Sequence, residues 1–235
     1  MSKERIRVAS YNVHAGVGTD GTFSPERIAS VITELGADVV GLQEVHSGDG
    51  SFSMLDTLAR ATGMHAIAGP THSRPSHGEF GNALLTRHKV VTVRQLNLAV
   101  TGREPRGALD VLLDCGSPLR VMATHLGLRP WERREQVAKL LQALTEDEGK
   151  QGTATTVLLG DINEWFLWGR PLRRLHKHFR SLPARRTFPA GWPVFALDRI
   201  WVKPFSLVRR VQAHRSPAAR LASDHLPLIA DIGPG

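Results

Sequence analysis

The feature that most constrains the fold is a series of short apolar runs that alternate with helix-like segments. Asp38–Gln43 is a nearly continuous apolar run, which is typical of a strand buried within a sheet. Thr155–Leu159 is predicted as a second strand. Ser24-Pro25 provides an N-cap followed by proline at the first helical position, and apolar residues then recur at helical spacing, at Ile28, Val31, Ile32 and Leu35. Helix–strand alternation of this kind predicts an α/β fold.

Other segments predict the remaining elements. We expect further helices at Ser51–Ala61, after Pro130 and at Arg170–Phe179. We expect further strands at Ile6–Asn12, Asn82–Thr86, Val90–Leu96, Ala108–Leu113, Leu119–His125, Leu197–Val202, Leu207–Ala213 and Pro227–Ile232. The middle of the chain leaves little room for helices, and no long linker interrupts it. The sequence therefore predicts one domain over residues 1–235, with two packed sheets flanked by helices.

Composition bounds the class of protein. With 235 residues, of which 41% are hydrophobic, the chain can bury one core and is short for two domains. Cys115 is the only cysteine, so neither an intramolecular disulfide nor a cysteine metal cluster can form. No apolar run approaches the roughly 20 residues that span a bilayer, and the N-terminus does not resemble a signal peptide. We therefore expect a cytoplasmic protein, with peripheral contact to a membrane as an option.

The positive charge of the chain is concentrated in one segment. Residues 165–223 contain 13 Lys and Arg against one acid, Asp198, although the whole chain has 30 basic and 22 acidic residues. Such a segment attracts phosphate-rich partners, either nucleic acid or anionic lipid. A solvated basic face without a specific partner would have the same composition.

Polar side chains stand where several predicted strands begin or end. They are Asn12, Glu44, His125, Asp161 and Asn163 after strands, and Asp198, Asp224 and His225 before strands. In α/β folds the ends of strands bring distant residues into one cleft. Carboxylate and amide oxygens suit Mg²⁺, and histidines beside carboxylates suit proton transfer and charge stabilisation.

Six short motifs occur in a fixed order: Ser10-Tyr11-Asn12, Gln43-Glu44, Thr124-His125-Leu126, Gly160-Asp161-Ile162-Asn163, Leu197-Asp198-Arg199-Ile200 and Ser223-Asp224-His225. Each motif is weak alone. The ordered set, within residues 6–232, resembles the endonuclease/exonuclease/phosphatase superfamily, which includes deoxyribonuclease I, neutral sphingomyelinases and inositol polyphosphate 5-phosphatases. Residues 80–87 and 105–109 are similar to small bacterial members. The resemblance implies a four-layer α/β sandwich of two mixed β-sheets packed face to face, with the active site at one edge.

The resemblance also implies a metal site and a catalytic carboxylate. Glu44 would be the principal ligand of Mg²⁺, with Mn²⁺ as a plausible substitute. Asn12 would complete the polar shell of the metal or hydrogen-bond a coordinated water. Asp161 would orient and deprotonate the attacking water, and Asn163 would hold that water or a phosphate oxygen. The plainer interpretation of the asparagines is that they are turn residues.

Two histidines would face the substrate phosphate. His225 would bind the scissile phosphate, and Asp224 would fix its ring or join the metal shell. His125 would be the second phosphate-facing histidine, with Asp198 setting its tautomer from behind. Arg106 would clamp phosphate oxygens, because a guanidinium group matches them bidentately, although a surface arginine is the alternative.

The implied activity is metal-dependent hydrolysis of a phosphoric ester. Metal-assisted water would attack a phosphodiester or phosphomonoester in line, and a phospholipid headgroup is one candidate substrate. A Mg²⁺-dependent endonuclease or exonuclease acting on DNA or RNA is the main alternative. A non-catalytic domain that binds phosphate or nucleic acid is a third hypothesis.

One unusual segment bears on the partner. Residues 165–168 have the sequence Trp-Phe-Leu-Trp, and several basic residues follow. Tryptophan favours the bilayer boundary and basic residues favour anionic headgroups, so residues 165–180 predict contact with an anionic membrane surface. Nucleic acid is the alternative partner. The opposing interpretation packs Trp165 and Phe166 into the core under the following helix. No obligate protein partner is inferred.

Overall fold

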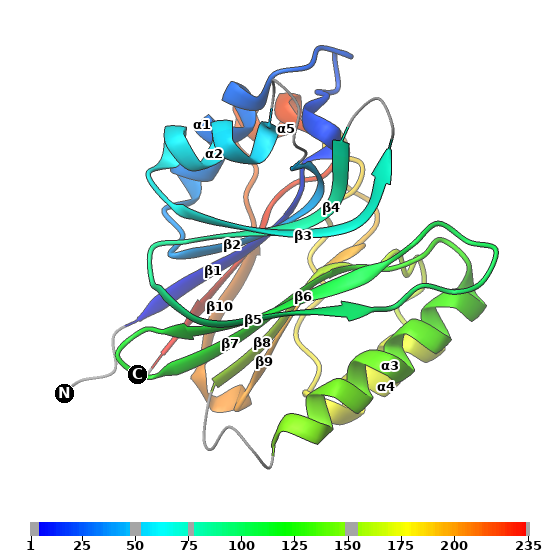
Figure 1. The fold of residues 1–235 in the computed structure, drawn as a ribbon. Coiled ribbons are helices and arrows are strands. Elements are labelled where there is room, and N and C mark those ends of the chain that lie inside the picture. The colour runs from blue at the N-terminus through cyan, green and yellow to red at the C-terminus, as the bar shows by residue number, and fades with distance from the viewer. Residues whose placement is uncertain (1–4, 48–52, 75–77, 149–154, 234–235) are drawn as a thin grey trace.

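Two mixed β-sheets packed face to face form the centre of the protein (Figure 1). The computed structural model describes residues 5–47, 53–74, 78–148 and 155–233. The first sheet has the order β10 (Val208–Ala213), β11 (Leu228–Ile232), β1 (Ile6–Asn12), β2 (Val39–His46), β4 (Gly78–Thr86) and β3 (His65–Arg74). The second has the order β5 (Lys89–Asn97), β6 (Gly107–Asp114), β7 (Pro118–His125), β8 (Thr155–Asp161) and β9 (Asp198–Lys203). The predicted fold class is confirmed.

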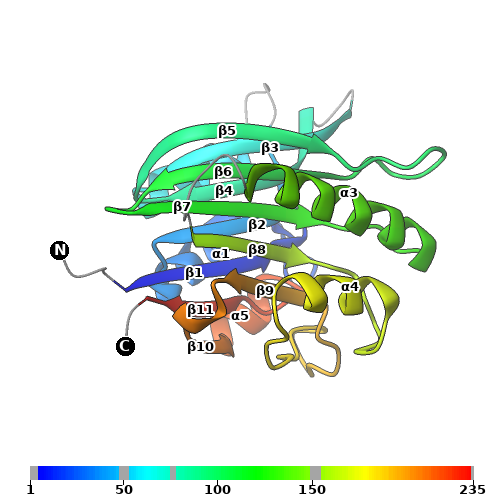
Figure 2. The same cartoon turned by 90° about the horizontal axis from the view of Figure 1, so that it is seen from below.

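Helices cover the outer face of each sheet. The helices α1 (Pro25–Leu35), α2 (Met54–Thr62) and α5 (Pro217–Ala222) pack on the first sheet, and α3 (Pro130–Glu148) and α4 (Arg170–His178) pack on the second. Figure 2 shows α3 and α4 side by side. The short helices η1 (His14–Gly16) and η2 (Phe205–Leu207) complete the described elements. A third apolar cluster lies between the sheets and includes Val8, Val39, Leu84, Val121 and Leu159. These three cores separate four layers.

Both sheets present the predicted site residues at one shared edge. β1 runs parallel to β2, and β7 runs parallel to β8, so these four strands end there. β9 and β11 are antiparallel to their neighbours β8 and β1, so they begin there. The backbone register pairs His125 with Asp161, and Asp161 with Asp198, on adjacent strands. Hydrogen bonding of the sheet thus places these three residues together.

The sequence prediction missed one strand and one helix and began another helix too early. The strand β3 was not expected, because its Gly69-Pro70 pair is typical of a turn. Proline is nevertheless tolerated in an edge strand, and β3 is at the edge of its sheet. The helix α5 is only six residues long, too short for a periodic apolar pattern, and it begins after Ser216, whose Oγ accepts a hydrogen bond from Ala219 N. The helix predicted at Ser51–Ala61 begins at Met54, and residues 51 and 52 lie outside the described residues.

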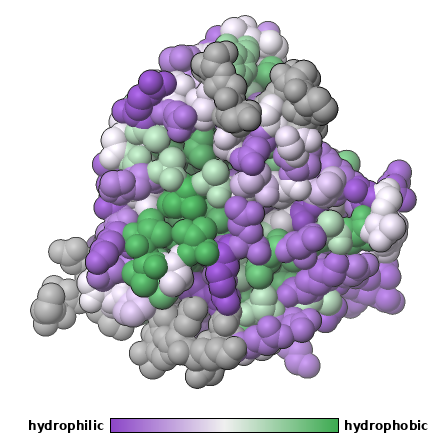
Figure 3. Space-filling model, in the orientation of Figure 1, coloured by the Kyte–Doolittle hydropathy of each residue, from purple (hydrophilic) through white to green (hydrophobic). Residues whose placement is uncertain are grey.

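Apolar surface reaches solvent at the sheet edges. Figure 3 shows apolar side chains gathered over the edge strands β3 and β5, and β5 carries the exposed Val91 and Val93. Across the described ranges, no helix has the length and apolar character needed to cross a membrane.

Gly160 allows β8 to approach β7 directly before Asp161. Its φ is +147°, and a Cβ atom there would overlap the carbonyl oxygen of Thr124. We predict that Gly160→Ala lowers the free energy of unfolding by at least about 3 kcal/mol, because strain and overlap coincide. Urea denaturation measures this. A Cβ at Gly191 would meet no atom within 4 Å, so Gly191→Ala should change stability by less than about 0.5 kcal/mol. Equal stability of the two variants would contradict the prediction.

Candidate active site

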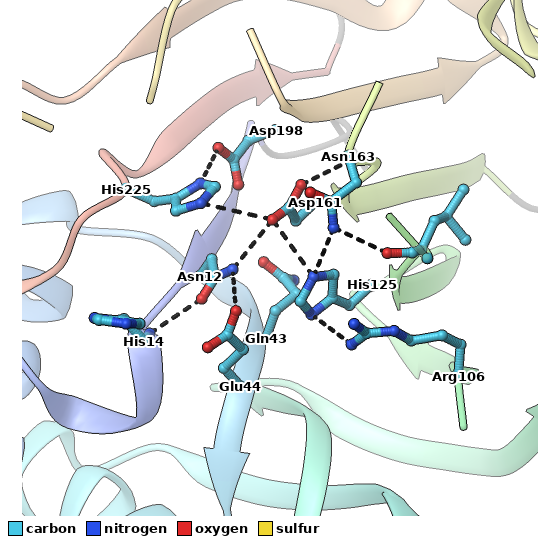
Figure 4. Close-up of polar contacts among 12 residues, drawn as sticks. Asn12, His14, Gln43, Glu44, Arg106, His125, Asp161, Asn163, Asp198 and His225 are labelled. Carbon is cyan, nitrogen blue, oxygen red and sulfur yellow. Dashed lines mark hydrogen bonds and ion pairs between the residues drawn. The ribbon is translucent and has the colours of Figure 1, made fainter. Parts of the chain in front are cut away.

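The amide of Asn12 links the two sheets at the shared edge (Figure 4). Its Nδ2 atom donates to Glu44 Oε1 at 2.9 Å and to Asp161 Oδ2 at 3.1 Å. Its Oδ1 atom accepts a hydrogen bond from His14 N at 3.0 Å, which fixes the orientation of the amide. The Asn12 nitrogen therefore lies between the two carboxylates and holds both in position. A direct bond from its oxygen to a metal stays a prediction.

Glu44 is held in an irregular part of β2. The pairing of β2 with β4 shifts register between Leu42 and Val45, and Glu44 adopts a φ of +61°, which non-glycine residues rarely adopt. Burial raises the pKa of Glu44, the hydrogen bond from Asn12 opposes this, and the negative charges of Asp161 and Asp224 raise it further. A cation beside this carboxylate would relieve both burial and repulsion. The site therefore fits an oxygen-binding divalent metal ion.

Asp161 is the centre of the cluster. Its carboxylate is buried, and Oδ1 accepts a hydrogen bond from Asn163 N at 2.9 Å. Its Oδ2 atom lies 3.5 Å from His125 Nε2 and 3.6 Å from His225 Nε2. Asn163 has a φ of +53°, so the chain turns sharply after the carboxylate. One carboxylate oxygen thus faces two imidazoles and the linking amide.

Asp198 orients His225, whereas the sequence analysis had paired Asp198 with His125. His225 Nδ1 lies 2.8 Å from Asp198 Oδ2, and the same oxygen accepts a 2.6 Å hydrogen bond from Thr187 Oγ1. The predicted pairing of Asp198 with His125 is therefore wrong. Burial alone would lower the pKa of His225, but the neighbouring carboxylates, Asp198 first and then Asp161, raise it to about 10. At neutral pH this imidazole carries a positive charge.

His125 differs from His225 in its hydrogen-bond partners and in its charge state. Arg106 Nη1 lies 3.2 Å from its Nδ1 atom, and Asn163 Nδ2 lies 3.0 Å from its Nε2 atom and donates to Leu126 O. Burial lowers the pKa of His125 to about 3; Asp161 opposes the shift, and Arg106 and His225 add to it. The ring is therefore neutral at neutral pH. The two histidines flank Asp161 as one neutral and one charged imidazole.

Arg106 and Asp224 complete the predicted residues. Arg106 is buried, its Nη2 atom donates to Glu104 at 2.8 Å, and its Nε atom has no hydrogen-bond partner among the described residues. It lines the cleft, where its guanidinium could contact an anion. Asp224 is half-buried, and its Oδ1 atom lies 3.9 Å from His14 Nδ1. Asp224 therefore lies on the Glu44 side of the cluster and does not take the role of fixing the His225 ring, which Asp198 fills.

An open cleft of about 570 Å³ exposes this cluster to solvent. Its polar wall includes Glu44, Glu104, Arg106, His125, Asp161, Asn163 and His225, and its apolar wall includes Phe80, Leu128, Trp165, Phe188 and Leu197. The ligand atoms of Asp161, Asp198 and His225 lie within 4.8 Å of one another, close enough to hold a metal ion. Because Asp198 is already bonded to Thr187 and His225, we assign it to hydrogen bonding.

Sequence reasoning missed three residues of the site. Thr187 is buried and donates a hydrogen bond to Asp198. Phe188 packs against His225 in a tilted arrangement with ring centroids 4.8 Å apart, and the backbone of His14 positions the Asn12 amide. Thr187 and Phe188 lie between α4 and β9, in a segment whose only regular pairing is the isolated bridge of Phe188 with Phe195, and they follow no periodic pattern. His14 stands two residues after Asn12, and only this proximity could have pointed to it.

The Thr187 hydroxyl gives a stability prediction. Thr187→Val keeps the shape but removes the donor to a buried carboxylate, so it should lower the free energy of unfolding by about 1–3 kcal/mol. Thr187→Ser keeps the hydroxyl and should recover most of this loss. Urea denaturation of the two variants makes the comparison. A Val variant as stable as the Ser variant would show that the hydroxyl does not stabilise Asp198.

The chain is similar in sequence and in fold to several known proteins. It is 29% identical over 255 residues to YbhP, an uncharacterised protein of Escherichia coli K12, covering 97% of this chain and 96% of YbhP. The human Nocturnin catalytic domain with bound sulfate anion has a TM-score of 0.77 at 24% identity, covering 97% of this chain and 93% of that one. The mannosyl-6-phosphatase Bt3783 of Bacteroides thetaiotaomicron has a TM-score of 0.76 at 19% identity, covering 96% and 98%. The model of the Endonuclease/Exonuclease/phosphatase family matches residues 9–225. The protein therefore belongs to the endonuclease/exonuclease/phosphatase family.

Proposed function

We propose that the protein is a Mg²⁺-dependent phosphoesterase that hydrolyses a phosphate ester by direct attack of water. Its family consists of hydrolases that act on phosphoesters. The observation that carries the proposal is the position of Asp161, a buried carboxylate between a neutral and a charged imidazole at the floor of an open cleft. A base, a cationic group and a cation-binding carboxylate thus meet where a phosphate could enter.

Glu44 is the residue that would hold the metal ion. Its raised pKa marks a carboxylate with unfavourable burial and repulsion, and hard oxygen ligands favour Mg²⁺ over zinc. Mn²⁺ should substitute, since it takes the same ligands. When bound, such an ion offsets negative charge on the phosphate oxygens and orients the ester. Asp224 adds negative charge on this side of the cluster.

Asp161 is the proposed base. One of its oxygens accepts the Asn163 backbone hydrogen bond, and the other accepts the Asn12 amide hydrogen bond. These two contacts hold the carboxylate plane in place, so a water beside it would be aligned before the reaction begins. Asn163 also lines the cleft, and its side chain would help to orient the same water.

His225 and Arg106 are the proposed phosphate contacts. The positive charge of His225 is maintained by Asp198, so the imidazole can stabilise charge that grows on the phosphoryl oxygens. Arg106 has a buried Nε donor without a partner among the described residues, which an anionic oxygen would satisfy. His125, neutral and held by Arg106, lies on the opposite side of Asp161 and can position the ester.

A nuclease is the second candidate, and one observation favours it. Phe188 lines the cleft next to His225, and an unpaired base could stack on its ring. A substrate panel with Mg²⁺ separates the candidates by comparing plasmid DNA, abasic DNA and RNA with phospholipids and inositol phosphates. Cleavage of nucleic acids alone would support the nuclease and exclude the lipid headgroup as substrate.

Metal dependence is the direct test of the proposal. We predict that EDTA abolishes hydrolysis of the best substrate and that Mg²⁺ or Mn²⁺ restores it. Glu44→Gln removes an anionic ligand, so the dissociation constant for Mn²⁺, measured by calorimetry without substrate, should rise at least about tenfold. The matched control is Glu104→Gln, which removes a carboxylate from the Arg106 side of the cleft and should leave Mn²⁺ affinity unchanged. Full activity in EDTA, or wild-type affinity of Glu44→Gln, would refute the metal assignment.

A further inference from the structure

A rim of exposed apolar side chains borders the cleft. We define the aromatic rim as Trp165, Phe166, Leu167 and Trp168, which are 39%, 58%, 56% and 72% exposed. The interpretation that packs Trp165 and Phe166 into the core is therefore wrong. Contiguous exposed apolar groups of this size typically mark a surface that contacts another molecule.

Aromatic contacts join the rim to the active site. Trp165 packs edge-on against Phe195 at 4.7 Å and against Phe188 at 5.9 Å between ring centroids. Phe188 in turn packs against His225. Phe195 is itself 37% exposed. Two loops far apart in sequence thus form one apolar surface that begins at the cleft.

The rim is held in position by a buried ion pair. Glu164, directly before Trp165, pairs with Arg133 of α3 at 3.2 Å, and both side chains are buried. Glu164 Oε1 also accepts a hydrogen bond from Phe166 N, and Gly169 N donates to Phe166 O. These contacts hold the backbone while the apolar side chains project into solvent. The exposure is therefore built into the fold.

A cationic helix face continues from the rim. α4 begins at Arg170 and buries Leu172 and Leu175, so its exposed side carries Arg170, Arg173, Arg174 and Lys177, which we call the basic face. No acidic residue occurs in α4. Arg174 Nη1 donates to Arg134 O at 3.4 Å. Arg134, an exposed residue of α3, therefore lies beside the basic face. Apolar and cationic groups therefore adjoin on one side of the protein.

We propose that the aromatic rim and the basic face dock the protein on an anionic lipid bilayer. Tryptophan and phenylalanine side chains enter the boundary between headgroups and acyl chains, and the arginines and the lysine contact anionic headgroups. The cleft mouth then lies next to the bilayer, because Trp165 belongs both to the rim and to the wall of the cleft. The proposal concerns binding and does not depend on the proposed hydrolysis.

The composition of the rim favours lipid over single-stranded nucleic acid. Base stacking requires open aromatic faces spaced along a groove. Here Phe166 and Trp168 pack against each other at 5.4 Å, and Trp165 is engaged edge-on by two rings. Leu167 has no face on which a base can stack. A compact cluster that mixes aromatic and aliphatic side chains suits insertion into an apolar boundary.

Vesicle co-sedimentation tests the docking. The full chain is mixed with vesicles of equal parts phosphatidylglycerol and phosphatidylcholine, or of phosphatidylcholine alone, in EDTA so that metal-dependent hydrolysis does not interfere. We expect binding to the anionic vesicles that weakens with salt. Arg173→Glu with Arg174→Glu should weaken it at least about 25-fold, since each basic residue contributes about fivefold. Trp168→Ala should weaken it about tenfold, because apolar burial is lost.

The matched control changes the same charge elsewhere. Arg210→Glu with Arg215→Glu alters two exposed arginines on β10 and before α5, outside the docking face, and should weaken binding less than about fivefold. Lipids brominated along the acyl chain should quench tryptophan fluorescence of the wild type, and Trp168→Ala should reduce the quenching. Equal binding by both double variants would overturn the proposal. The proposal would also be overturned if the wild-type protein did not bind anionic vesicles. This includes the outcome in which it binds single-stranded DNA through the same residues.

Discussion

The arrangement of the site depends on one buried contact between the two sheets, the hydrogen bond from Asn12 to Asp161. Asp161 comes from the second sheet and Asn12 from the first, so this bond aligns the sheets at the edge where the cleft opens. Gly160 makes it feasible, because only glycine lets β8 approach Thr124 so closely. Backbone pairing then brings His125 and Asp198 beside Asp161. The geometry of the site is thus a consequence of how the sheets pack.

The electrostatics of the cluster follow from this packing. Burial and Arg106 keep His125 neutral, whereas the Asp198 and Asp161 carboxylates keep His225 charged. The two imidazoles lie at similar distances from the same carboxylate oxygen. Their other neighbours nevertheless leave His125 neutral and His225 positively charged. In the proposed reaction, such divergence between like groups would separate the tasks of binding an anion and orienting an ester. Burial and nearby carboxylates raise the pKa of Glu44, so a bound cation would stabilise its charged form.

The sequence predicted the fold class and the residues that meet at the sheet edge, because apolar strands followed by polar side chains are a local pattern. It did not predict which carboxylate faces which histidine. Asp198 was expected beside His125, but that choice depends on the distance between segments, and the sequence gives only their order. Thr187 lies in an irregular segment without periodicity, so no signal identified it. The strand β3 was missed because Gly69-Pro70 resembles a turn unless the strand is known to be an edge.

In the proposed mechanism, Asp161 activates the attacking water. The most direct measurement is the single-turnover rate of Asp161→Asn at saturating Mg²⁺ on the best substrate of the panel. Loss of a general base typically costs about 10²–10⁴-fold, and we predict a loss in this range for the folded variant at saturating Mg²⁺. A rate within about tenfold of wild type would contradict the claim that Asp161 is the base.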